Sequence, residues 1–291
     1  MFNRLRYYLA EMFPLSSFIG TLVTALAIQF VFLKLSGLSI KFHFSFIMSG
    51  LFTVSLSLLL RIMDEFKDYE DDKKNFPERP LPSGKVNSKD LIFLGWFCVA
   101  CMLLSSLGNL KIFIASVLVL FYAYLMLKWF FVESKMRKSL PLALVSHHPI
   151  VFINIFYLLF VLSESIPGTD FSKVLYILPV PLIFTNWEFA RKIRATQDET
   201  NYTTYSKIMG PRLAVFLCLI LQLIIYLGVM NLLKLIQSWS IIPIVFSGLM
   251  LILSLSFMRF LWNPSYSVKL KKNAEGQILI VIFCLIWASL W

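Results

Sequence analysis

Residues 42 to 85 read FHFSFIMSGLFTVSLSLLLRIMDEFKDYEDDKKNFPERPLPSGK, and this stretch decides the fold. Residues 42 to 62 form an apolar run, and a membrane-spanning helix needs about 20 predominantly apolar residues. The run is followed at once by a segment rich in Asp, Glu and Lys, which needs contact with water. We therefore predict a membrane helix that ends in a charged segment at the membrane surface.

The rest of the chain has the same character. Of its 291 residues, 58% are hydrophobic and 15% are charged, and the mean hydropathy is +0.77, which excludes an ordinary soluble globular domain. We predict an all-α fold, a polytopic membrane helical bundle of about nine transmembrane helices. The predicted spans are residues 14–34, 42–62, 90–108, 111–128, 140–162, 173–190, 212–233, 239–260 and 276–291.

The distribution of basic residues predicts the orientation. The net charge of +11 could indicate nucleic acid, but the basic residues lie between apolar runs, so we expect no nucleic-acid partner and interpret them as topology signals. With a cytosolic amino terminus, 22 of the 27 Lys and Arg residues fall on the inside, as cytosolic loops require. Two of the predicted cytosolic segments, 61–90 and 186–211, also hold most of the acidic residues.

Three aspartates in the first acidic segment are spaced for metal binding. Asp64, Asp68 and Asp72 follow one another at intervals of four, so on a helix they form a row on one face. Like charges at this spacing destabilise a helix, and a bound cation would remove that cost. Carboxylate oxygens suit magnesium (Mg²⁺), which also binds substrate phosphates. The alternative is a solvated charged face on which nearby lysines pair with the acids.

The loop after this helix favours the metal-binding interpretation. Residues 75 to 84, NFPERPLPSG, hold three prolines and one glycine, which predict a rigid turn after the helix ends near Pro77. Arg79 lies in this loop, and a guanidinium group can bind a phosphate through two hydrogen bonds. The segment therefore combines candidate metal ligands with a candidate phosphate-binding arginine.

The first motif resembles that of the UbiA superfamily of intramembrane prenyltransferases. That family has N-x-x-x-D-x-x-x-D followed by R-P-x-x-S-G, and here the string is D64-EFK-D68-YED-D72 followed by RPLPSG. Asp68 and Asp72 match the metal-binding aspartates, and Asp64 stands where the family has Asn. The resemblance implies one UbiA-like domain over residues 1–291, with Asp64, Asp68 and Asp72 as metal ligands and Asp68, Asp72 and Arg79 as catalytic residues.

The second family motif is altered in this chain. The corresponding segment is NWEFARKIRATQDETNYTTYSKIMG, residues 186 to 210. If one helix continues through it, Glu188, Lys192 and Glu199 lie on one side. The resemblance implies that Glu188, Asp198 and Glu199 hold a second Mg²⁺, with Arg191 and Lys192 on the diphosphate. The alternative is pairing of Glu188 with Arg191 and Lys192 within the helix.

Polar residues on two further spans are candidates for substrate contacts. Tyr122, Tyr124 and Lys128 resemble a family pattern near the diphosphate, although Lys128 is equally placed to extend to the membrane surface. His147 and His148 are polar groups within an apolar run, where they would orient an acceptor or simply pack between helices. We expect neither histidine to be a metal ligand.

The resemblance implies an enzyme that transfers an isoprenoid chain from an allylic isoprenyl diphosphate to a lipophilic, membrane-associated acceptor, expected to be aromatic, with Mg²⁺ as cofactor. The protein would lie in the lipid bilayer, which is the inner membrane if the cell is bacterial, with the active site facing the cytosol. Two alternatives stay open. One is a UbiA-type terpene cyclase, and the other is a non-catalytic lipid-binding scaffold.

Overall fold

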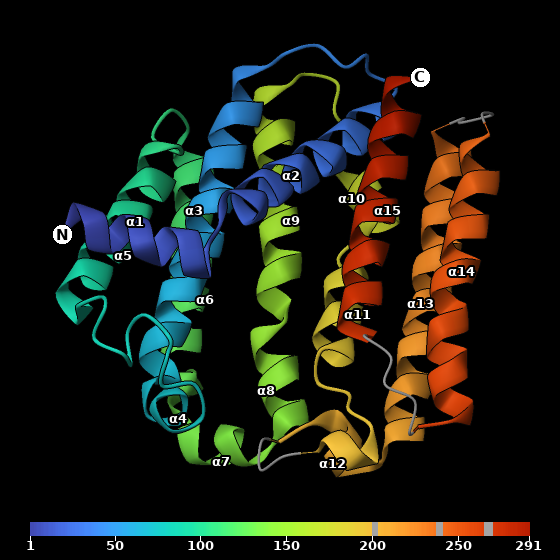
Figure 1. The fold of residues 1–291 in the computed structure, drawn as a ribbon. Coiled ribbons are helices and arrows are strands. Elements are labelled where there is room, and N and C mark those ends of the chain that lie inside the picture. Colours follow the sequence, from blue (N-terminus) through green and yellow to red (C-terminus); the bar gives the residue numbers. More distant parts are fainter. Residues whose placement is uncertain (200–202, 237–240, 265–269) are drawn as a thin grey trace. The chain divides into compact units, whose positions relative to one another are not determined.

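The computed structural model describes residues 1–199, 203–236, 241–264 and 270–291, and within these ranges all regular structure is helical (Figure 1). The prediction of an all-α fold is confirmed. Within the described ranges, seven helices are long and apolar enough to cross a membrane: α2 (Leu15–Leu35), α3 (Phe44–Lys67), α6 (Leu110–Leu127), the α8–α9 pair (Leu140–Ser165), α13 (Pro211–Leu235), α14 (Ile242–Trp262) and α15 (Leu270–Leu290).

The other two predicted spans also coincide with helices. Residues 90–108 correspond to α5 (Ser88–Leu104), which is 17 residues long. Residues 173–190 form α10 (Val174–Ile177) and α11 (Leu182–Ala190), with Pro179 and Pro181 in the interruption. Proline has no backbone N–H and clashes with the preceding helical turn, so two of them break this span. A bundle of about nine transmembrane helices therefore agrees with the helices of the structure.

The remaining helices are short. They are α1 (Phe2–Met12), α4 (Tyr69–Asn75), α7 (Glu133–Lys138), α12 (Tyr205–Met209) and the one-turn 3-10 helices η1 (Trp129–Phe131), η2 (Phe171–Lys173) and η3 (Thr196–Asp198). The chain forms two compact units. Unit 1 comprises Met1–Leu26, Lys41–Glu133 and Phe156–Pro167, and unit 2 comprises Ala27–Ile40, Ser134–Ile155 and Gly168–Trp291.

Unit 1 is built around α3, which packs on α5 and α6. Gly95 of α5 faces Leu59 and Ile62 of α3, so the two helices approach closely. The Phe52 and Tyr157 rings stack with centroids 3.7 Å apart, and the Ser116 hydroxyl lies 3.0 Å from the Tyr157 hydroxyl. These contacts hold α3 along its middle turns, and α4 and the first acidic motif follow at its lower end (Figure 1).

Unit 2 contains a ring of helices in which α11 packs on α13 and α15, and α14 packs on the same two helices. Asn186 on α11 donates a 2.6 Å hydrogen bond from Nδ2 to Gln277 Oε1 on α15, and both residues are fully buried. Close packing also joins α13 to the proline break, because a Cβ atom added at Gly228 would lie 2.2 Å from Pro179 Cβ. The position therefore requires glycine.

Candidate functional site

The three aspartates of the first motif lie across the junction of α3 and α4. Asp68 is the C-cap of α3, and α4 begins at the next residue. The backbone spacing of a helix continues through the junction, since Asp68 N–H donates to the Asp64 carbonyl at 2.9 Å and Asp72 N–H donates to the Asp68 carbonyl at 2.7 Å. The structure thus keeps the spacing of four that the sequence predicts.

The first and last carboxylates of the motif, those of Asp64 and Asp72, differ in solvent exposure. The Asp72 side chain is 8% exposed and the Asp64 side chain is 49% exposed. Arg79 Nη1 lies 2.6 Å from both carboxylate oxygens of Asp72. The Arg79 guanidinium group also lies over the Phe76 ring, 4.3 Å from its centroid. The loop arginine and the last aspartate of the motif therefore form a partly buried ion pair in unit 1.

The loop geometry brings Arg79 back to α4. The helix ends at Asn75, two residues before Pro77, which agrees with the predicted stop. The Arg79 N–H then donates to the Phe76 carbonyl, and the Ser83 N–H donates to the Arg79 carbonyl. Gly84 has a φ of 75°, a left-handed conformation that favours glycine. These turns fold residues 76–84 into a compact loop beside the acidic helix.

A second cation lies next to the motif. Lys67 Nζ is 3.9 Å from Asp64 Oδ1 and 4.1 Å from the centroid of the Trp129 ring. Its side chain is only 6% exposed. On a solvated charged face Lys67 would only pair with the acids, but the structure places it against an aromatic ring, where a partly desolvated cation is better stabilised.

The segment that contains Trp129 has an unusual backbone. Trp129, Phe130 and Phe131 have φ values of 50°, 50° and 60°, in the left-handed region that aromatic residues rarely adopt. Such strain persists only when the surroundings hold it, and it is common near functional sites. No pattern in the sequence predicts this turn.

The candidates on α6 lie just before this turn. Lys128 is the C-cap of α6 and is exposed. Tyr122 is partly buried and meets Phe130 edge to face, with ring centroids 5.5 Å apart, whereas Tyr124 is 45% exposed. Residues two apart on a helix point in very different directions. The structure therefore does not bring Tyr122 and Tyr124 together on one face of α6.

In the second acidic segment the helix does not continue. Helix α11 ends at Ala190, Arg191 is its C-cap, and Asp198 lies in η3. The helical alignment expected for Glu188, Lys192 and Glu199 is therefore wrong. Because the backbone turns away after Ala190, positions beyond it no longer follow the angular spacing of a helix.

The contacts of Glu188 match the alternative considered from the sequence. Arg191 Nε donates to Glu188 Oε2 at 2.5 Å, and Lys192 Nζ lies 3.0 Å from Glu188 Oε1. Glu199 instead accepts hydrogen bonds from the Thr204 and Ser206 hydroxyl groups, at 2.8 and 2.5 Å. The sequence alone does not single out these two hydroxyl partners. Asp198 is exposed.

The histidines and one buried carboxylate complete the candidate polar groups. His148 Nε2 lies 2.6 Å from the Thr185 hydroxyl, and His147 Nδ1 lies 3.0 Å from the Ala143 carbonyl. Glu65 is 1% exposed and accepts from Arg61, while its Oε2 has no hydrogen-bond partner in the described part of the chain. Glu65 was not predicted. Its only sequence signal was the spacing of four from Arg61.

The donor chemistry of the first motif fits Mg²⁺, but the described residues do not form a preassembled cluster. Among them, no group of three or more His, Cys, Asp or Glu side chains is close enough to hold a metal ion. Asp68 and Asp72 are one helical turn apart, and one of them is paired with Arg79. They supply the hard oxygen ligands that Mg²⁺ prefers.

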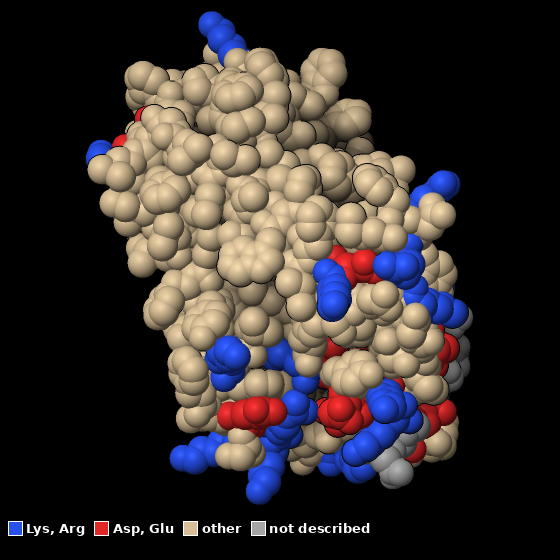
Figure 2. All heavy atoms as spheres, turned by 90° about the vertical axis from the view of Figure 1, so that its left-hand side faces the viewer, with Lys and Arg blue, Asp and Glu red and all other residues tan. Residues whose placement is uncertain are grey.

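Charged side chains gather at one end of the surface shown in Figure 2, and the broad area above them carries few charges. Long apolar helices with a charged end are what a bilayer requires. The fold and the first motif together define an integral membrane protein. Its candidate site combines the aspartates of the first motif with the cations Arg79 and Lys67.

The model of the UbiA prenyltransferase family matches residues 17–279, so the chain belongs to this family. This confirms the resemblance identified from the first motif. Family membership supports prenyl transfer within the membrane in general terms.

Two solved structures share the fold. One is a digeranylgeranylglyceryl phosphate synthase, with a TM-score of 0.64, 16% identity, and coverage of 99% of each chain. The other is a UbiA homologue from Aeropyrum pernix K1, with a TM-score of 0.67 and 16% identity over 91% of this chain and 97% of that one. No curated protein matches the sequence.

Proposed function

We propose that this protein is a Mg²⁺-dependent enzyme that transfers an isoprenoid chain from an allylic isoprenyl diphosphate to a lipophilic acceptor in the membrane, with an aromatic acceptor as the expected class. One catalytic domain spans residues 1–291 in this proposal. The observation that carries it is the Asp72–Arg79 pair, which lies one helical turn from Asp68 in a family motif.

The reaction breaks the bond between the allylic carbon and the diphosphate oxygen, and the diphosphate leaves with the electron pair. The acceptor then forms a bond to the allylic carbon and loses a proton. A bound Mg²⁺ would neutralise charge on the departing diphosphate. Asp64, Asp68 and Asp72 are the proposed ligands for it.

The cationic side chains have a complementary role. Arg79 is proposed to donate hydrogen bonds to the diphosphate as negative charge develops there, since fixed donors of this kind lower a barrier strongly. Lys128, Arg191 and Lys192 are proposed to bind the same group, and Tyr122 and Tyr124 to contact the substrate. Glu188, Asp198 and Glu199 are the proposed ligands of a second Mg²⁺.

The test is pyrophosphate release by purified, detergent-solubilised protein with geranyl, farnesyl or geranylgeranyl diphosphate, with and without Mg²⁺. We expect release that requires Mg²⁺ and is lost in Asp68→Asn and Asp72→Asn. Glu70→Gln is the matched control, because Glu70 is an exposed acid on the same helix outside the motif spacing. Full turnover in both aspartate variants would contradict the proposal.

Product analysis separates the competing functions. A prenylated acceptor supports transfer, and a cyclised hydrocarbon or alcohol formed without acceptor supports the cyclase. If the protein neither releases pyrophosphate nor binds the diphosphates in a Mg²⁺-dependent manner, the lipid-binding scaffold is favoured.

A further inference from the structure

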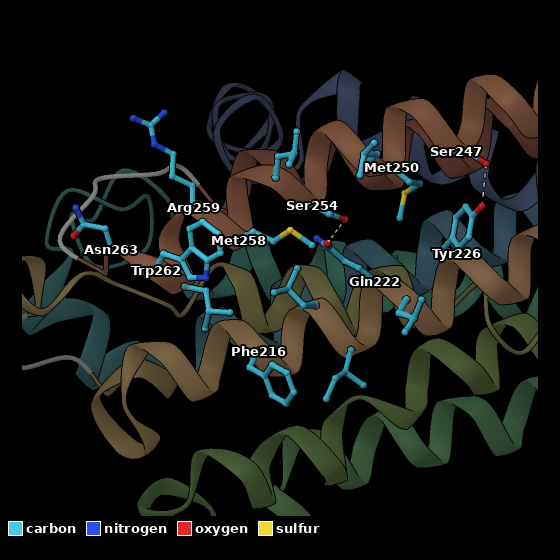
Figure 3. A pocket seen from close by; sticks show the side chains of 16 residues that line it. Phe216, Gln222, Tyr226, Ser247, Met250, Ser254, Met258, Arg259, Trp262 and Asn263 are labelled. Carbon is cyan, nitrogen blue, oxygen red and sulfur yellow. Dashed lines mark hydrogen bonds between the residues drawn. The ribbon is translucent and has the colours of Figure 1, made fainter.

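A long apolar groove runs along unit 2 between α13 and α14 (Figure 3), and none of the acidic residues of the two motifs lines it. Its volume is about 1390 Å³, and nearly all of its lining is apolar. Leu223, Leu251 and Trp262 line it and are 56%, 59% and 86% exposed, so the groove is open at the surface.

The charge in this groove is confined to one end. Figure 3 shows Arg259, Trp262 and Asn263 together at that end, the Gln222–Ser254 hydrogen bond midway, and Tyr226 with Ser247 at the other end. The groove extends for 16 residues of chain from Ser247 to Asn263, about 24 Å at the helical rise of 1.5 Å per residue. This is more than half of the roughly 30 Å hydrocarbon core of a bilayer.

A second cavity adjoins the charged end. Asn263 lines both cavities, and the smaller one is also lined by Arg212 and Gly210 at the start of α13. The amino-terminal end of a long helix favours an anion. Among the described residues that line the two cavities there is no Asp or Glu. The charged lining residues are therefore cations, Arg259 in the groove and Arg212 in the smaller cavity.

A buried donor lies inside the apolar part. Gln222 is 2% exposed, and its Oε1 accepts from the Ser254 hydroxyl at 2.9 Å. Its Nε2 has no hydrogen-bond partner within the described ranges. A buried donor without an acceptor is costly. An occupant with a carbonyl oxygen would satisfy it, whereas a pure hydrocarbon would not.

We propose that this groove is a binding site for an acidic glycerophospholipid, with an acyl chain between α13 and α14 and the phosphate group at Arg212 and Arg259. The apolar length takes the acyl chain, the ester carbonyls supply acceptors below the phosphate, and Trp262 lies at the interfacial level where tryptophan is enriched. Charge complementarity selects an acidic headgroup.

The test uses the full chain, purified and delipidated in detergent, with phosphatidylglycerol or phosphatidylcholine of identical acyl chains, and native mass spectrometry to count bound lipid. We expect preferential retention of phosphatidylglycerol. Each of Arg212→Gln and Arg259→Gln should weaken phosphatidylglycerol binding about fivefold, because a cation near an anionic headgroup contributes on that scale. Lys234→Gln is the matched control, since Lys234 is an exposed cation at the opposite end of α13.

A groove-filling variant distinguishes a lipid from a free anion. Leu251→Trp should reduce the binding of phosphatidylglycerol, because it occupies the acyl path, but it should leave any binding of inorganic phosphate unchanged. Equal retention of the two lipids by the unsubstituted protein would overturn the proposal. So would an unchanged phosphatidylglycerol preference in both arginine variants, with folding verified by circular dichroism.

Discussion

One nitrogen of Arg79, Nη1, lies 2.6 Å from both carboxylate oxygens of Asp72, and this pair closes the loop that follows the first acidic motif. Two groups with different proposed partners, a cation for the carboxylate and a phosphate for the guanidinium, thus bind one another. If metal and diphosphate occupy the site, the Asp72–Arg79 contact would be replaced by a contact of Asp72 with the metal and a contact of Arg79 with the phosphate.

Arg79→Gln should lower the maximal rate of pyrophosphate release by about 10²–10³, the effect of removing one fixed donor to developing charge. At the same time it removes the competitor for Asp72, so half-maximal activity should need less Mg²⁺. A Mg²⁺ titration of the residual activity measures both quantities. An unchanged rate, or a higher Mg²⁺ requirement, would argue against a shared role of the pair.

Gly228→Ala should destabilise the protein, because the added methyl group would lie 2.2 Å from Pro179 Cβ. Overpacking of this kind costs about 1–3 kcal/mol. Gly248→Ala on α14 is the control, since nothing lies within 4 Å of its added Cβ, and it should stabilise the helix by about 0.5–1 kcal/mol. Denaturant unfolding in detergent measures the change in unfolding free energy for each variant. Equal changes in the two variants would refute the packing argument.

Gln277→Leu should cost about 1–3 kcal/mol, because it leaves the buried Asn186 amide without its partner at 2.6 Å. The double variant with Asn186→Leu should lose less than the sum of the two single losses. A double-mutant cycle on unfolding free energies measures this difference, and hydrogen bonds between membrane helices average about 0.6 kcal/mol in such cycles. Strict additivity would show that the two side chains act independently.

Phe131→Gly should be more stable than Phe131→Ala, the reverse of the usual order. Phe131 has a φ of 60° and is 70% exposed, so both variants lose little packing, but only glycine adopts the left-handed region without a penalty. The expected difference is about 1 kcal/mol. Thermal unfolding of the two variants compares them, and a more stable alanine variant would contradict the strain.

Cysteine labelling from one side of the membrane tests the predicted orientation. In a background without the four native cysteines, Ser83→Cys should react with an impermeant maleimide only from the cytosolic side. Gly108→Cys, in the exposed turn before α6, should react only from the outside. Both substitutions leave the charge of the loops unchanged, so they do not disturb the basic residues that set topology. Reaction of both from one side would overturn the predicted orientation.

The sequence predicts the helices well because hydrocarbon leaves a backbone few alternatives to helix. Long apolar runs therefore locate α3, α6 and α13, and the RPLPSG loop locates the first motif and the family. Pro179 and Pro181 are helix-breaking residues inside an otherwise apolar run, so a prediction from the length of the run alone gives one continuous span there.

Contacts between residues at irregular positions could not be predicted in the same way. The pairing of Asp72 with Arg79 depends on how α4 ends and how the loop turns back. The end of α11 at Ala190 has no Gly or Pro signal, and the chain instead folds onto itself through Tyr205 N–H and the Lys192 carbonyl. For the altered second motif, the sequence therefore predicts candidate residues, but the helical alignment it predicts for them is wrong.

The proline break between α10 and α11 has a further consequence for how this chain tolerates hydrocarbon. Around Val180 the backbone forms four-residue turns, each closed by a hydrogen bond between residues three apart, in place of helical hydrogen bonds. One example runs from Val180 N–H to the Ile177 carbonyl at 2.9 Å. Irregular backbone at membrane depth survives only where protein shields it from lipid. Helix α13 packs against this break at Gly228. Because Gly228 has no side chain, α13 comes close enough to cover the polar backbone groups between α10 and α11.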